Sequence, residues 1–142
     1  MIKIGNNLSE WSTYSCQPKT RDELIDIIQD KISKEGPNCD LNDIDTSLIT
    51  DMSYLFANKL FNCNISEWNT SNVVNMIGMF YKSNFNGDIS KWNVSKVRSM
   101  GDMFAKSKFN QDISNWKINK KCTIIHMFVS CDINKKFKPK SL

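Results

Sequence analysis

Apolar and polar positions along this chain recur at a fixed interval of 24 residues, without insertion or deletion, from residue 37 to residue 134. The recurrence is clearest in the columns Phe56, Phe80, Phe104 and Phe128; Trp68, Trp92 and Trp116; and Met52, Met76 and Met100. A period of this size is typical of a solenoid, in which each repeat is one coil stacked on the next. The pattern predicts coils at 37–60, 61–84, 85–108 and 109–132, within a repeat domain spanning 37–134.

Residues 20–35 have the pattern of an amphipathic helix. Thr20 is a suitable N-cap and Glu23 completes a capping box, while Gly36 and Pro37 end the segment. The apolar stripe consists of Leu24, Ile25, Ile28 and Ile32. We expect residues 1–36 to form a lead-in, which carries Trp11, and a helix that caps the first coil; the alternative is a partner-binding helix.

Each coil contains the unit M-x-x-[LM]-F, as in residues 52–56, or a close variant of it. Its apolar side chains share one face of a helix, and an N-cap residue type precedes each unit. These preceding residues are Asp51, Asn75, Ser99 and Thr123. The unit therefore predicts a capped helical turn in every coil.

The other half of each coil centres on an isoleucine, at Ile65, Ile89 and Ile113, which we expect to lie in short strands. Strands pairing from coil to coil in a parallel sheet, alternating with helical turns, predict an α/β solenoid. An asparagine column, which we expect to point inward and form a hydrogen-bonded ladder, runs through Asn38, Asn62, Asn86, Asn110 and Asn134. We expect the Phe and Trp columns to form the core. Residues 135–142 begin a fifth coil and then become a basic tail.

The segment FNGDISKWNVSKVRSMGDMF, at residues 85–104, closely resembles the repeat of the BspA-like leucine-rich-repeat family. The lead-in from Gly36 to Asp45 resembles the family as well, and the similarity spans about residues 18–134. Members look like curved leucine-rich-repeat solenoids; many are bacterial surface proteins that bind other proteins, and similar repeats occur in mycoplasma lipoproteins and large DNA viruses. The resemblance implies a protein-binding fold and brings no catalytic residues.

Composition narrows the possible functions. The 142 residues, 40 % hydrophobic, suit one domain, and no apolar run approaches the roughly 18 residues of a membrane span. No secretion signal is apparent, so we expect an intracellular protein unless a signal was removed. Five cysteines without CxxC spacing favour reduced thiols. Cys39 and Cys63 share a repeat column, so a disulfide or metal bridge between them is one possibility. The other members of that column, Gly87 and Gln111, favour an exposed variable position instead.

Catalytic and metal chemistry have little support in the sequence. His126 is the single histidine of the chain. Together with Cys122 and Cys131 it could provide three zinc ligands, but no fourth ligand is evident in the sequence. Asp88 and Asp112 share a repeat column, so we interpret them as structural carboxylates that bond to the local backbone. We therefore expect neither enzymatic activity nor a metal or cofactor.

Charge is unevenly distributed along the chain. Residues 1–71 carry 6 basic and 11 acidic side chains, and residues 72–142 carry 13 basic and 4 acidic, giving net charges of −5 and +9. The columns that change character, together with nearby lysines, are the candidate partner-binding residues. They are Glu67, Lys91 and Asn115; Asn72, Lys96 and Lys120; Arg98; and Lys117 and Lys121. The alternative is a solvated face that keeps the solenoid soluble.

Three functions fit these features. The favoured one is a non-catalytic protein-binding module for an acidic protein surface, in a narrower form a phage or viral protein that sequesters a host factor. The second is electrostatic binding of nucleic acid or another anionic surface through the basic half. The third is a purely structural unit that self-associates through its coil ends. Outside that case we expect a monomer or weak self-association.

Overall fold

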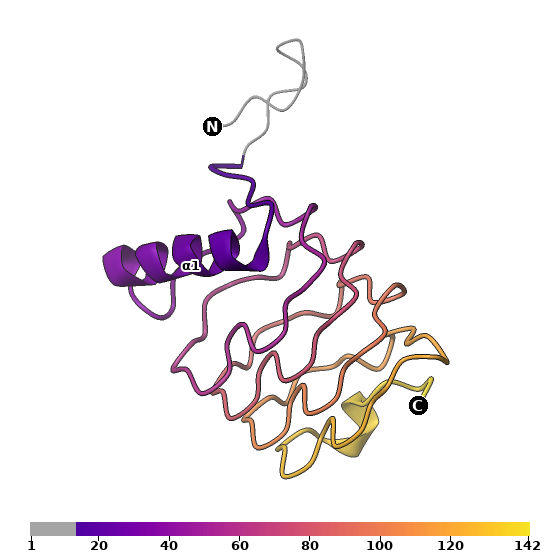
Figure 1. Cartoon of the computed structure of the whole chain (residues 1–142). Helices are drawn as coiled ribbons and strands as arrows, with labels where there is room; N and C mark the ends of the chain where they lie inside the picture. Colours follow the sequence, from indigo (N-terminus) through magenta and orange to yellow (C-terminus); the bar gives the residue numbers. More distant parts are fainter. Residues whose placement is uncertain (1–13) are drawn as a thin grey trace.

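The computed structural model describes residues 14–142, which form a series of stacked coils (Figure 1). Two helical elements accompany the coils, α1 at Arg21–Glu35 and the short 3-10 helix η2 at Lys135–Phe137. α1 lies at the indigo end of the stack and η2 at the yellow end. Trp11 of the predicted lead-in lies outside the described residues. The sequence period thus corresponds to one coil of the stack.

α1 begins and ends where the sequence predicts. Thr20 Oγ1 accepts a hydrogen bond from the backbone N–H of Glu23 at 3.2 Å. The Glu23 carboxylate accepts one from the backbone N–H of Lys19 at 2.7 Å. Gly36, with φ of 89°, follows the helix and donates its N–H to the Ile32 carbonyl. These contacts satisfy backbone groups that helix ends otherwise leave unpaired.

One face of α1 packs against the first coil. Leu24 and Ile28 are buried in the same apolar cluster as the first-coil residues, and Ile25 and Ile32 pack against that cluster while half-buried. Arg21 adds a polar contact, because its Nε donates to the Ser53 carbonyl at 2.7 Å. α1 therefore covers apolar surface at this end of the stack, as expected of an N-terminal cap.

The helical turns predicted for the M-x-x-[LM]-F units do not form. Among residues 36–134 the structure has no helix; instead, alternate N–H groups of each unit donate to carbonyls of the next coil. In the first coil, Met52 donates to Asn75 at 2.8 Å and Phe56 to Met79 at 2.9 Å. An α-helix directs its N–H groups along its own axis, so it could not supply these bonds between coils. The prediction of one helix per coil was wrong.

A repeated left-handed conformation allows this pairing. Two residues of every coil have positive φ, and one column of these residues is Tyr54, Gly78, Asp102 and His126. The second column is Asn58, Lys82, Lys106 and Ser130. Residues between them close short turns, such as the Leu55 N–H to Met52 carbonyl bond of 3.3 Å. Alternation of conformations turns every second N–H towards the next coil.

The predicted strands at Ile65, Ile89 and Ile113 are also absent. The described residues contain only isolated parallel bridges, such as those joining Asn75 to Asp51 and to Ser99. The chain turns too soon to extend a ladder: the Trp92 N–H, for example, bonds to the carbonyl of Ile89, three residues earlier. The architecture is therefore a stack of irregular coils with one N-terminal α-helix, and the α/β description was wrong.

The asparagine column forms the predicted ladder from Asn62 to Asn134, but on the surface, and Asn38 does not take part because the Asn62 N–H bonds to the Pro37 carbonyl instead. Asn62 Oδ1 accepts from the Asn86 N–H at 3.0 Å, Asn86 Oδ1 from the Asn110 N–H at 2.8 Å, and Asn110 Oδ1 from the Asn134 N–H at 2.7 Å. All four residues are exposed, so the inward orientation that we expected was wrong. These side chains supply acceptors where no backbone carbonyl of the neighbouring coil does.

Aromatic columns form the core, as predicted. Phe56, Phe80 and Phe104 are fully buried, and successive ring centroids in their column lie 5.6, 5.5 and 5.7 Å apart, ending at the half-buried Phe128. The tryptophan column has spacings of 6.4 Å at both steps. Offset stacking of this kind adds to the free energy gained by burying the rings.

The tryptophans also make hydrogen bonds that the sequence analysis did not anticipate. Each indole Nε1–H of the Trp68, Trp92 and Trp116 column donates to a backbone carbonyl of the preceding coil. The acceptors are Leu41 for Trp68 (2.9 Å), Ile65 for Trp92 (3.1 Å) and Ile89 for Trp116 (3.0 Å). The Trp column therefore joins neighbouring coils by both stacking and directed bonds.

The C-terminal segment continues along the fourth coil further than predicted. Phe137 accepts from the Ile113 N–H at 3.0 Å, Lys140 donates to the Ser114 carbonyl at 3.2 Å, and Ser141 Oγ bonds to the Trp116 carbonyl at 3.1 Å. We expected residues 135–142 to begin a fifth coil and then become a basic tail. Instead the tail lies along residues 113–116 of the fourth coil, the segment that contains Trp116.

Candidate functional site

All nine residues predicted to bind a partner lie exposed on the surface of the stack. Repetition along the columns determines which of them meet. Lys91 Nζ lies 3.4 Å from Glu67 Oε1, and Lys96 Nζ lies 3.3 Å from Asn72 Oδ1, each pair one coil apart. Both contacts are solvent-exposed, so each adds little to stability.

Two asparagines of the set have a structural contact as well. Asn72 Nδ2 donates to the Ser47 carbonyl at 2.7 Å, and Asn115 Nδ2 donates to the Ser90 carbonyl at 3.2 Å. Both bonds tie a coil to the one before it. These two side chains are therefore less available to a partner than the cationic ones.

Four cations of the set have no partner within the described residues. The side chains of Arg98, Lys117, Lys120 and Lys121 make no hydrogen bond or ion pair with any residue of 14–142. Lys117 and Asn115 line a shallow hollow of about 270 Å³ beside the edges of Trp92 and Trp116. The structure thus brings Lys117 and Asn115 together, whereas no contact joins Lys91 to Lys96.

A second lysine cluster, which was not predicted from the sequence, lies at another corner of the coils. Lys59, Lys82, Lys106 and Lys108 line one hollow of about 210 Å³. Lys82 Nζ and Lys106 Nζ lie 5.3 and 6.0 Å from the centroid of the Tyr81 ring. The signal was present in the sequence, since Lys82 and Lys106 are one period apart.

The rim of the fourth coil carries unpaired backbone donors. In the earlier coils, alternate backbone N–H groups bond to carbonyls of the next coil. The equivalent N–H groups of the fourth coil bond to no described residue; they are those of Ile124, His126, Phe128 and Ser130. Two apolar side chains beside them, Ile125 and Val129, are 67 % and 47 % exposed. This rim combines apolar surface with hydrogen-bond donors.

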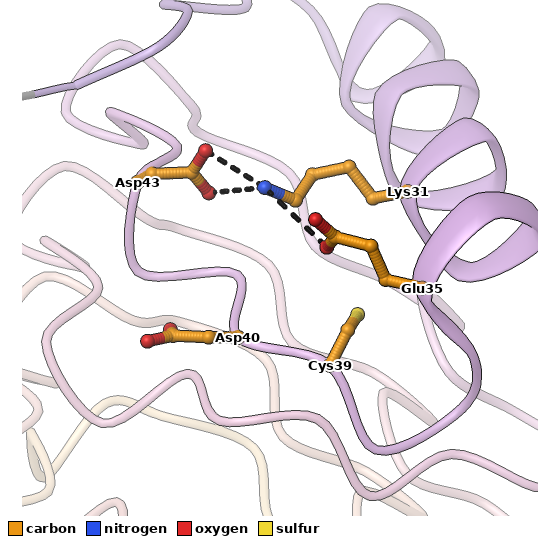
Figure 2. Close-up of a pocket in the computed structure, with 5 residues that line it drawn as sticks. All are labelled: Lys31, Glu35, Cys39, Asp40 and Asp43. Carbon is orange, nitrogen blue, oxygen red and sulfur yellow. Dashed lines mark hydrogen bonds and ion pairs between the residues drawn. The ribbon is translucent and has the colours of Figure 1, made fainter.

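A pocket of about 400 Å³ lies between α1 and the first coil (Figure 2). Lys31 Nζ lies 2.6 and 2.7 Å from the two Asp43 carboxylate oxygens, and Ser15 Oγ donates to the same carboxylate at 2.7 Å. Burial tends to raise the pKa of Asp43, but the bonds from Lys31 and Ser15 outweigh it and hold the pKa below its usual value. Burial likewise tends to lower the pKa of Lys31, and Asp43 raises it overall. The pair fastens α1 to the first coil.

Asp88 and Asp112 have the structural role that the sequence predicts. Each Oδ1 accepts a 2.9 Å bond from the N–H two residues on, at Ser90 and Ser114. Backbone and side-chain bonds from these serines lower the pKa of both carboxyls. Both carboxylates are therefore acceptors within local turns.

The residues considered for zinc are not brought together. His126 Nδ1 lies 3.9 Å from Asp102 Oδ1, whereas Cys131 Sγ contacts Ser107 Oγ at 3.5 Å. Within residues 14–142 no group of three or more histidine, cysteine, aspartate or glutamate side chains is placed to hold a metal ion.

Cys39 and Cys63 differ from the expectation of an exposed column. They are 8 % and 1 % exposed, and their sulfur atoms lie 2.9 Å apart. The expectation came from Gly87 and Gln111, which occupy the same column in later coils and are half-buried. In the first two coils the position faces the apolar cluster that also contains Leu24 and Ile28 of α1.

Together these features define a repeat protein with a buried aromatic core and exposed variable columns. Residues 28–140 match the model of the family described as "Mycoplasma protein of unknown function, DUF285", and the chain belongs to that family. No curated protein and no solved structure matches the chain. Within the described residues, no helix has the length and apolar character to cross a membrane.

Proposed function

We propose that this protein is a non-catalytic protein-binding module, a leucine-rich-repeat-like solenoid whose exposed cations engage an acidic surface on another protein. The observation that carries the proposal is the division of the repeat. Its recurring Phe, Trp and Met side chains are buried, except for the half-buried Phe128, whereas the nine candidate partner-binding residues are exposed. Residues that vary on a constant scaffold are suited to recognition.

Rigidity of the scaffold supports this function. Every coil is joined to the next by backbone bonds, by stacked aromatic rings and by indole–carbonyl bonds. A preformed surface loses little conformational entropy on binding, so more of the contact free energy contributes to affinity.

The unpaired cations give the proposed partner its chemistry. Arg98, Lys117, Lys120 and Lys121 make no ion pair with any carboxylate of residues 14–142, and residues 72–142 carry a net charge of +9. Excess positive potential steers an acidic partner and raises the association rate. In the narrower form, in which this is a phage or viral protein, the acidic partner is a host protein.

Nucleic acid is the second candidate, favoured by the additional lysine cluster at Lys59, Lys82, Lys106 and Lys108. Binding to single strands generally adds aromatic stacking, and direct base readout generally uses arginine, asparagine or glutamine. Here Trp92 is 4 % exposed and Trp116 2 % exposed, which leaves no stacking platform on that side. A protein partner is therefore preferred.

Affinity capture from a host-cell lysate, with and without nuclease, tests the proposal. We expect a discrete protein that remains bound after nuclease treatment and whose affinity for the purified chain changes modestly between low and physiological salt. Retention that disappears with nuclease, together with an affinity that falls linearly on a log–log plot against salt, would support the nucleic-acid candidate instead.

A further inference from the structure

Two cysteines at equivalent positions of the first and second coils lie in contact. The Sγ atoms of Cys39 and Cys63 are 2.9 Å apart. Their backbones are held side by side, because the Asn62 N–H bonds to the Pro37 carbonyl at 2.9 Å and the Asn64 N–H to the Cys39 carbonyl at 2.9 Å. Adjacent hydrogen-bonded segments lie about 4.8 Å apart. A disulfide spans Cα atoms roughly 4.4–6.8 Å apart, so the register suits one.

The two thiols have different access to solvent. Cys39 lines the pocket beneath α1, where its sulfur points towards the space beside Glu35 and Lys31 (Figure 2). Cys63 lies behind it, 1 % exposed, with its Sγ 3.2 Å from the Pro37 carbonyl. Burial and the neighbouring Cys39 raise the pKa of the Cys63 thiol to about 12. A small reagent would therefore meet Cys39 first.

We propose that Cys39 and Cys63 form a disulfide bond by exchange with a low-molecular-weight disulfide. The Cys39 thiolate attacks one sulfur of the small disulfide, forms a mixed disulfide and releases one small thiolate. Cys63 then attacks the Cys39 sulfur, which breaks the mixed disulfide, and its proton passes to the second small thiolate as that thiolate leaves. Two cysteines are oxidised, and one small disulfide is reduced to two thiols that take up the two protons.

The bond would fasten α1 and the first coil to the second coil. Gly87 and Gln111 occupy this position in the later coils, so the cross-link is specific to the α1 end of the stack. It closes the loop from residue 39 to residue 63, which restricts the unfolded chain. For a loop of this length we expect the melting temperature to rise by about 10 °C on oxidation.

The test uses the full purified chain, reduced and then incubated with oxidised glutathione. We expect non-reducing peptide mapping to show a Cys39–Cys63 cross-link, a melting temperature raised by about 10 °C, and reversal of both by dithiothreitol. A Cys122→Ser variant, which removes a half-buried cysteine outside the Cys39–Cys63 pair, should behave like the unmodified chain. Cys63→Ser should instead stop at a glutathione adduct on Cys39.

Three results would overturn the proposal. They are wild-type chain that keeps both thiols free, wild-type chain that accumulates a stable glutathione adduct on Cys39, and cross-links formed mainly by other cysteines. The decisive measurement is made on the wild-type chain, so it does not depend on whether a variant folds. None of these outcomes bears on partner binding, which is tested separately.

Discussion

Truncation of phenylalanines at different positions of one column tests whether the coils stack in the order described. Phe80 sits in the middle of its column, with ring centroids of Phe56 and Phe104 at 5.6 and 5.5 Å and that of Phe85 at 4.5 Å. Phe128 occupies the equivalent position in the fourth coil, where its stacked neighbour is Phe104 at 5.7 Å. Both residues are phenylalanines at the same repeat position. They differ because the Phe80 ring has a stacked phenylalanine of its column on both sides, whereas the Phe128 ring has one on a single side.

The structure gives the expected magnitudes. Phe80 is 0 % exposed, and Phe→Ala at a fully buried site typically costs about 3–5 kcal/mol of unfolding free energy. Phe128 is half-buried and stacked on one side, so we expect about half of that cost, roughly 2 kcal/mol. The predicted difference between Phe80→Ala and Phe128→Ala is therefore about 2 kcal/mol.

Urea unfolding followed by tryptophan fluorescence measures both costs, because neither substitution removes a tryptophan. The free energies are compared by linear extrapolation, after checking that the slope with urea is unchanged. If Phe128→Ala proved as costly as Phe80→Ala, the fourth coil would have to be covered on both sides, and the stacking order would be wrong.

Three further predictions test individual interactions. Asn86→Ala should cost about 1 kcal/mol by removing a rung of the ladder, whereas Lys91→Ala should change unfolding free energy by less than about 0.5 kcal/mol; equal effects in urea would refute a structural ladder. Trp92→Phe should cost about 1–3 kcal/mol because the Ile65 carbonyl loses its indole donor, and a neutral result in urea unfolding followed by circular dichroism would contradict that bond. The lowered pKa of Asp43 stabilises the fold above the unfolded-state pKa of about 3.9, and this contribution is lost as pH falls through the lower folded-state value. Thermal melts from pH 7 to pH 2 should therefore show a shallower acid decline for Asp43→Asn; an unchanged profile would contradict the assignment.

Local signals predicted α1 correctly. Thr20 at its start and Gly36 at its end act within a few residues of sequence, and Thr20 caps the Glu23 N–H as predicted. The Glu23 carboxylate departs from an ideal capping box, because it accepts from the Lys19 N–H. The 24-residue period likewise predicted which aromatic residues are buried. Burial follows from side-chain size and repetition, which the sequence states directly.

Conformation within each coil was harder to predict. The apolar spacing of residues 52–56 fits a helix, but the same spacing also fits a chain that alternates right- and left-handed residues and bonds to the next coil. Gly78, Asn58 and Asp102, whose types tolerate positive φ, were the available signals. Tyr54 at positive φ gave no such signal.

The residue types within a repeat column did not predict the burial of the cysteines or the contacts between surface lysines. Gly87 and Gln111 suggested an exposed position, yet α1 covers the same position in the first coil and buries Cys39. For the candidate site, the period predicted exposure of the cations. It did not indicate that Lys82 and Lys106 meet beside Tyr81, because that depends on how the coil turns its corner.

Charge reversal on two faces of the same chain tests the central claim most directly. The binding variant carries Arg98→Glu, Lys120→Glu and Lys121→Glu, and the control carries the same number of reversals at Lys82, Lys106 and Lys108. Affinity of each for the nuclease-resistant captured protein is measured alongside its melting temperature. We predict that the binding variant melts like the wild type and loses at least about tenfold in affinity, while the control retains its affinity. Equal losses from both variants would show that net charge alone governs binding, and no loss from either would contradict the proposed surface.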